Sequence, residues 1–177
     1  MTAVKSNTEL PSDPAGERLF ADKIVAVSTE RPSAVGPASK LAATISGKVY
    51  TFTPNELGVK SLSLVLADGQ SRYTVETYAR NTAKSGLTLA GPIGLDGNYR
   101  KGKPIYHGLS ERLEGMPRVD ATKGTWQGEN TFLIERLCLG EGEPPEQWTL
   151  SFFGTRVNLL ARFPEGQETF IEGEAGG

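Results

Sequence analysis

From residue 45 to residue 163 the chain is a series of short β-prone segments separated by tight-turn signals. The segments recur about every 8–12 residues, which is typical of an all-β sandwich or barrel. The clearest segment is 59–67, where Leu62, Leu64 and Leu66 occupy every second position. That period is typical of a strand with one buried face. Asp68-Gly69 follows it and favours a hairpin turn.

The whole series predicts about eight or nine strands. A closed barrel removes exposed sheet edges, and about eight strands enclose an interior that side chains can fill. We therefore predict an all-β fold, an antiparallel up-and-down, lipocalin-like barrel of about eight strands with an N-terminal helix. The strands are expected near 43–53, 59–67, 71–79, 87–95, 104–108 (weak), 122–127, 130–139, 147–153 and 156–163. The interior candidates are Trp126, Phe132, Ile134, Trp148, Leu150, Phe152, Val157 and Leu159.

The segment before the barrel predicts a helix over residues 14–29. Asp13 suits the N-cap and Pro14 the first helical position, and an apolar stripe of Phe20, Ile24 and Val27 follows at helical spacing. This stripe should lie on the barrel or on a neighbouring domain, because it would otherwise be exposed.

The predicted domain organisation has three parts. Residues 1–40 are a helix followed by a Pro/Ser/Ala linker, residues 41–172 are the barrel, and residues 173–177 are a disordered tail. A chain of 177 residues with 37% hydrophobic content fits one core plus an appendage.

Charge and hydropathy argue against two classes of partner. The net charge is −2 and the basic residues are scattered, whereas a nucleic-acid-binding protein concentrates positive charge. No run of residues approaches the apolar length of a membrane span. Residues 1–20 do not have the pattern of a secretion signal, so we expect the signal of any exported parent protein, periplasmic or secreted, to lie outside this sequence.

Several segments together resemble the C-terminal region of β-lactamase-like serine hydrolases, the penicillin-binding-protein-like family. Residues 45–64 contain ISGKVYTF and PNELGVKSLSL, similar to the pattern SGKxYxFxPNxLGxKSLxL of that region. GLDGNYR at 94–100 resembles GLDGxYR, GTWQGENTF at 124–132 resembles GxWxxxNTF, and QWTLSF at 147–152 resembles WTLxF. LPSDPA at 10–15 is similar to the segment that leads out of the catalytic domain.

This resemblance covers about residues 10–163 and implies a non-catalytic accessory β domain. Its partner would be the catalytic serine-hydrolase domain of the same parent chain, a β-lactamase, D-peptidase or esterase. The domain would pack on that partner and shape substrate access. The alternative is a stand-alone lipocalin-like protein that binds a small apolar ligand. The length of the open reading frame would discriminate between the two.

The catalytic motifs of the family are not found with their spacing. No serine is followed three residues later by lysine, and no tyrosine is followed two residues later by Asn or Ser. Lys84-Ser85-Gly86 fits the third motif, Lys-Thr-Gly or a variant, but a tripeptide is weak evidence and a turn between strands is the favoured interpretation. We therefore expect no enzyme activity in this chain alone and assign no catalytic, cofactor-binding or metal-binding residue.

Four further features were weighed as sites. His107 is the only histidine, which argues against a metal centre and favours a loop or strand-edge position. Cys138 lies between Leu137 and Leu139, typical of a buried structural thiol rather than a nucleophile. The acidic residues Glu141, Glu143 and Glu146 suit a solvated hairpin loop better than a weak cation site, and Asp96-Gly97 suits a turn better than a recognition tip.

Overall fold

The computed structural model describes residues 14–18, 32–67, 70–78, 86–104, 119–140 and 142–176. The chain divides into two units, residues 1–31 and residues 32–177. In the first unit residues 14–18 are helical, at the predicted start of the helix. The apolar stripe of Phe20, Ile24 and Val27 lies outside the described residues.

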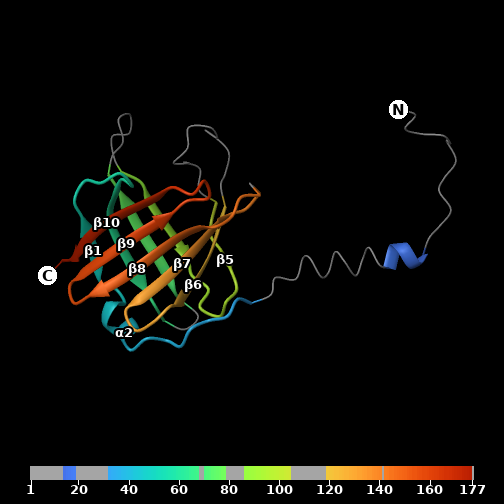
Figure 1. The fold of residues 1–177 in the computed structure, drawn as a ribbon, viewed down its shortest axis with the longest axis horizontal. Coiled ribbons are helices and arrows are strands. Elements are labelled where there is room, and N and C mark those ends of the chain that lie inside the picture. Colours follow the sequence, from blue (N-terminus) through green and yellow to red (C-terminus); the bar gives the residue numbers. More distant parts are fainter. Residues whose placement is uncertain are drawn as a thin grey trace. The chain divides into compact units, whose positions relative to one another are not determined.

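The second unit is an antiparallel sheet of ten strands that curves into a nearly closed barrel (Figure 1). Strands that are neighbours in sequence pair with each other, except β4 and β5 at the two ends of the sheet, and β1 pairs with β10. The all-β antiparallel barrel is therefore confirmed, and ten strands are found where about eight were expected. They are β1 (Val49–Phe52), β2 (Val59–Val65), β3 (Arg72–Thr77), β4 (Thr88–Pro92), β5 (Arg100–Lys101), β6 (Asp120–Trp126), β7 (Thr131–Cys138), β8 (Glu146–Phe153), β9 (Arg156–Arg162) and β10 (Glu168–Ala175).

The barrel interior is formed by alternate residues of the strands. In β8, for example, Trp148, Leu150 and Phe152 are buried while Thr149 and Ser151 are half-buried on the outer face, as the two-residue period of a strand dictates. All eight interior candidates from the sequence are buried.

Aromatic rings meet across the middle of the barrel. The Trp126 ring centroid lies 5.1 Å from that of Phe132 and 6.4 Å from that of Phe152. Phe152 in turn lies 5.6 Å from Tyr50 of β1. Residues of β1, β6, β7 and β8 therefore share one packed core, and the region between these strands is filled by side chains.

Gly94 joins the two ends of the sheet. Its N–H donates to the carbonyl oxygen of Thr122 (3.1 Å) and its carbonyl accepts from the N–H of Gly124 (2.8 Å), which forms an isolated parallel bridge to β6. Glycine is needed at position 124, because a Cβ there would lie 2.6 Å from the Phe132 ring. The seam between β4 and β6 is thus closed by a single residue rather than by a full ladder.

The first predicted strand, 43–53, is partly wrong. Residues Leu41–Ile45 form the short helix α2, and β1 begins only at Val49. Alanine-rich LAATI has good helix propensity, and Ile45 is buried against the core. Gly47 then turns the chain with a φ of 82°. The residues expected at the start of a strand therefore form a helix at one end of the barrel instead (Figure 1).

The expected disordered tail is also wrong for residues 173–175, which belong to β10. Gly173 pairs with Phe52 of β1 and with Val157 of β9. The acidic residues of β10 alternate outward while Thr169 and Ile171 are buried. The acidic composition of the segment hid the strand, because its inward face carries only Thr169, Ile171 and the small residues Gly173 and Ala175.

Two other expectations fall partly beyond what the structure covers. The weak strand at 104–108 lies mostly outside the described residues, and the strand found nearby is the two-residue β5. The Asp68-Gly69 turn is outside them as well. No helix in the described part of the chain has the length and apolar character to cross a membrane.

Candidate functional site

An ion cluster lies inside the barrel, where the sheet would otherwise be apolar. Arg136 of β7 extends inward between Glu146 of β8 and Asp120 of β6. It donates two hydrogen bonds to Glu146 Oε2, from Nε at 3.1 Å and from Nη2, and its Nη1 lies 3.6 Å from Asp120 Oδ2. The side chains are only 7%, 11% and 5% exposed for Arg136, Glu146 and Asp120. One buried cation thus lies between two carboxylates.

Aromatic residues enclose this cluster. Trp148 Nε1 donates to Glu146 Oε1, and the Arg136 guanidinium lies 5.2 Å from the Trp148 ring centroid in a cation–π geometry. Tyr73 of β3 packs edge-on against the same ring, with centroids 6.1 Å apart. Its ring reaches the cluster over Gly91, where a Cβ would lie 2.9 Å from Tyr73 Cε1.

The electrostatics of the cluster favour a charged Arg136 and a neutral Tyr73. Although burial opposes its charge, the carboxylates of Glu146 and Asp120 raise the pKa of Arg136 above its usual value. Burial raises the pKa of the Tyr73 hydroxyl, against opposing effects of Arg136 and of hydrogen bonding to Thr122 and Arg136. An arginine that stays charged and a tyrosine that stays neutral do not supply a base or a nucleophile. The arrangement is suited to holding β6, β7 and β8 in register.

A second feature lies on the outside of the barrel. Residues 32–39, here named the strap, run beside β6 and are tied by hydrogen bonds to β6, to the turn at Gly97 and to the turn that follows β6. The Ser33 N–H donates to the Gly97 carbonyl (3.0 Å), the Gly36 N–H to Thr125 Oγ1 (2.8 Å), and the Ser39 hydroxyl to the Glu129 carbonyl. The predicted linker is therefore a bound segment over these residues.

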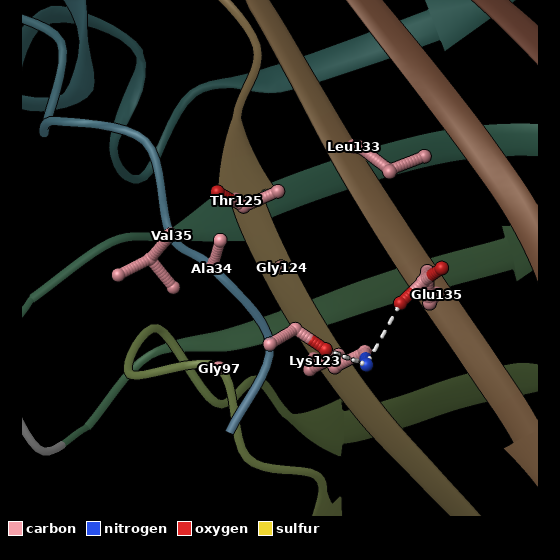
Figure 2. A pocket seen from close by; sticks show the side chains of 9 residues that line it. Ala34, Val35, Gly97, Lys123, Gly124, Thr125, Leu133 and Glu135 are labelled. Atoms are coloured by element: carbon pink, nitrogen blue, oxygen red, sulfur yellow. Dashed lines mark hydrogen bonds and ion pairs between the residues drawn. The ribbon is translucent and has the colours of Figure 1, made fainter. Parts of the chain in front are cut away.

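A small cleft opens between the strap and the outer faces of β6 and β7 (Figure 2). It encloses about 230 Å³ outside the protein atoms, part of it open to solvent. Its charged residues are Lys123 and Glu135. Lys123 Nζ lies 3.1 Å from Glu135 Oε2, within hydrogen-bond distance of Ser33 Oγ and 4.4 Å from the Tyr99 ring centroid. Its lining is completed by Ala34, Val35, Gly97, Gly124, Thr125 and Leu133.

Several residues weighed from the sequence fall outside the part of the chain that the structure describes. Lys84, Ser85, His107 and Glu141 lie outside the described residues. Cys138 is the last residue of β7 and is half-buried, rather than fully buried as expected.

The Asp96-Gly97 pair forms the expected turn. Asp96 accepts hydrogen bonds from Asn98 and from Arg100, and Gly97 has a φ of 82°. A role that the sequence did not indicate is that Gly97 is covered by Ser33 of the strap.

Glu146 is the main correction among these residues. It was grouped with a solvated acidic loop, whereas it begins β8 and faces the barrel interior. Glu143 is exposed as expected. The alternation of inward and outward residues along each strand could have predicted the ion cluster. Arg136 is two positions from Ile134, and Glu146 is two positions from Trp148, so both share a face with predicted core residues.

Within the described ranges, no group of three His, Cys, Asp or Glu side chains is placed to hold a metal ion. The two features with the most defined chemistry are thus the buried ion cluster and the strap with its cleft. Comparison with known proteins does not assign the chain to a family. No family model matches it, and no curated protein is found to match it.

Proposed function

We propose that this chain is a non-catalytic accessory β domain of a serine hydrolase of the β-lactamase-like class. In that role it packs on the catalytic domain and shapes the access of substrate. The proposal is supported by the structural role of the motifs that resemble this family. In the described residues their side chains build turns and core, which is the role of a scaffold.

The first two motifs organise β1 and β2. The Ser46 hydroxyl accepts the N–H of Leu66 (3.0 Å), and the Gly47 N–H donates to Leu64 (2.7 Å). In the next turn, Asn55 accepts the N–H of Val59 and donates to two backbone carbonyls. These contacts fix the path of the chain between the strands.

The later motifs close the barrel and fill it. Gly94 of GLDGNYR makes the bridge to β6. Gly124 and Phe132 of GTWQGENTF pack against one another, and Trp148 of QWTLSF covers the ion cluster. Motifs whose residues make such contacts suit a domain that positions a neighbour rather than one that performs chemistry.

The alternative, a lipocalin-like binder of a small apolar ligand, requires a hollow interior. Ring-to-ring contacts between Tyr50, Phe152, Trp126 and Phe132 occupy the middle of the barrel, which argues against it. A fluorescent fatty-acid analogue, dansylaminoundecanoic acid, tests this point. We expect no saturable increase in its fluorescence, and saturation at one equivalent would favour the binder.

The proposal is tested first on the isolated chain. Incubation with a fluorophosphonate or with a fluorescent penicillin should give no covalent adduct by mass, because a nucleophile and its base have to be held together for acylation. A stoichiometric adduct that disappears after prior denaturation would contradict the proposal.

The second test examines the parent protein. An antibody raised against the barrel should precipitate, from the source cells, a polypeptide much larger than the 19.0 kDa of this chain. That polypeptide should react with the fluorophosphonate on a segment outside the barrel. Recovery of an unreactive 19.0 kDa protein would overturn the accessory role.

A further inference from the structure

The edge of β6 that forms the seam is covered by different segments along its length. β5 covers its first part, where Arg100 pairs with Thr122, and the bridge of Gly94 covers the next part. In the described part of the chain, no strand pairs with this edge at Thr125 and Trp126. The last part of the edge therefore needs another cover, because the free backbone groups of an edge strand pair readily with other chains.

The strap lies along this last part of the edge (Figure 2). The Gly124 N–H donates across the seam to the Gly94 carbonyl (2.8 Å), and the backbone groups of Trp126, two residues further along the strand, point to the same side. A Cβ at Gly36 of the strap would lie 2.0 Å from the Trp126 carbonyl oxygen. The strap thus takes the place of a missing strand.

The hydrogen bonds of the strap join the two sides of the seam. Its Ser33 N–H is bound to the carbonyl of Gly97, in the turn by which the chain leaves β4. Further along, the Gly36 N–H is bound to Thr125 of β6. One end of the strap is therefore held by the segment that follows β4, and its middle is held by β6.

Core side chains lie directly behind the seam. A Cβ at Gly124 would lie 2.6 Å from the Phe132 ring and 2.9 Å from Ile93 Cγ2, and Ile93 and Trp126 are both buried. An opening at this place would expose apolar interior to water.

The seam is also the weakest junction in the described sheet. The ladder between β6 and β7 runs without interruption from Asp120 to Trp126, whereas Gly94 makes two backbone hydrogen bonds across the seam. Proteins open locally where few backbone hydrogen bonds have to break. The hydrogen bonds of the strap are thus a large share of what holds the seam together.

We propose that the strap is a latch. It keeps the seam closed, and its release opens the barrel between β4 and β6 onto Ile93 and Trp126 while the other ladders stay intact. A displacement of residues 32–39 is thereby transmitted to the barrel wall. The latch is a property of residues 32–177 alone and does not depend on the proposed function.

Hydrogen exchange on the full chain tests the latch. A release variant carries Ser33→Pro, which removes the N–H that donates to Gly97, and Thr125→Val, which removes the acceptor of the Gly36 N–H. The Gly94 and Gly124 amides should exchange roughly tenfold or more faster than in wild type. Amides within the ladder of β8 and β9 should keep their rates.

The matched control is Thr149→Val. Thr149 is half-buried on the outer face of β8, as Thr125 is on β6, but it makes none of the hydrogen bonds of the strap. This control should leave the Gly94 and Gly124 amides at their wild-type rates.

Thiol labelling shows whether the interior itself becomes accessible. In a Cys138→Ser background, Ile93→Cys places a thiol behind the seam and Val157→Cys places one in β9, and both positions are buried. Adding the two release substitutions should raise the rate of reaction with a fluorescent maleimide roughly tenfold or more at position 93. The rate at position 157 should not change.

Two results would overturn the latch. If the strap amides exchange faster while Gly94, Gly124 and the thiol at position 93 keep their rates, the strap lies on the barrel without holding it closed. If positions 93 and 157 and all ladders accelerate together, the release variant unfolds globally and the seam does not open by itself.

Discussion

Arg136 and Arg162 each pair with a glutamate on the neighbouring strand, but in different surroundings. Arg136 is 7% exposed and its partner Glu146 is 11% exposed, whereas Arg162 and Glu168 are each 52% exposed. Arg136→Met leaves two buried carboxylates without their cation and should lower the free energy of unfolding by about 3–5 kcal/mol. Arg162→Met should change it by about 0–1 kcal/mol. Urea denaturation measures both, and similar values for the two variants would contradict the buried cluster.

The Tyr50 hydroxyl is buried and has no hydrogen-bond partner among the described residues. A buried polar group without a partner costs about 1–3 kcal/mol, so Tyr50→Phe should leave stability unchanged or raise it by up to about 1 kcal/mol. Tyr78 is the control, because its hydroxyl donates to the carbonyl of Phe52. Tyr78→Phe should cost about 1 kcal/mol in urea denaturation. A clear loss of stability in Tyr50→Phe would show that its hydroxyl has a partner.

The contribution of Asp96 to stability depends on pH. Hydrogen bonds from Arg100 and then from Asn98 lower the pKa of its carboxyl from 3.8 to about 2. Because the folded-state pKa is depressed, the carboxylate contributes to stability above about pH 4 and this contribution is lost as pH falls through about 2. A carboxyl NMR titration should give a midpoint near 2 for Asp96, and Arg100→Gln should move it toward 3.8. A wild-type midpoint near 3.8 would rule out the pair in solution.

At the scale of elements, the strap depends on a glycine. A Cβ at Gly36 would collide with the carbonyl oxygen of Trp126, so Gly36→Ala should separate the strap from β6 and break the bond to Thr125 Oγ1. We expect a loss of about 1–3 kcal/mol and faster hydrogen exchange at the Gly36 and Ser33 amides. Gly176→Ala is the control, since no atom lies within 4 Å of a Cβ there. Unchanged exchange in Gly36→Ala would mean that the strap does not lie on β6.

At the scale of the whole molecule, β10 is the strand that joins β1 to β9 within the sheet. Removal of residues 168–177 exposes both neighbouring edges and part of the core, including the positions beside Phe52 and Val157. The truncated chain should lose its cooperative unfolding transition in circular dichroism. Removal of residues 176–177 alone should cost less than about 1 kcal/mol, because it breaks one backbone hydrogen bond to Val49. A cooperative fold in the longer truncation would contradict the role of β10.

The sequence by itself determined the antiparallel barrel and most of its interior. A two-residue period is a local property, so the inward faces of β7 and β8 could be assigned from Phe132, Ile134, Trp148 and Leu150 without knowledge of their partners. Turn residues such as Gly58 and Gly97 likewise act through their own backbone angles. The function was expected from a resemblance and remains a proposal.

Only the tertiary structure decided three other features. Glu146 lies in the interior because Arg136 is there to receive it, the strap is bound because Thr125 and Glu129 accept its hydrogen bonds, and β10 forms because two edges flank it. Small and acidic residues are common in flexible linkers and disordered tails. Composition alone therefore could not distinguish the strap and β10 from a linker and a tail. In each case the deciding free energy comes from residues that are distant in sequence, and only the closed sheet brings them within contact.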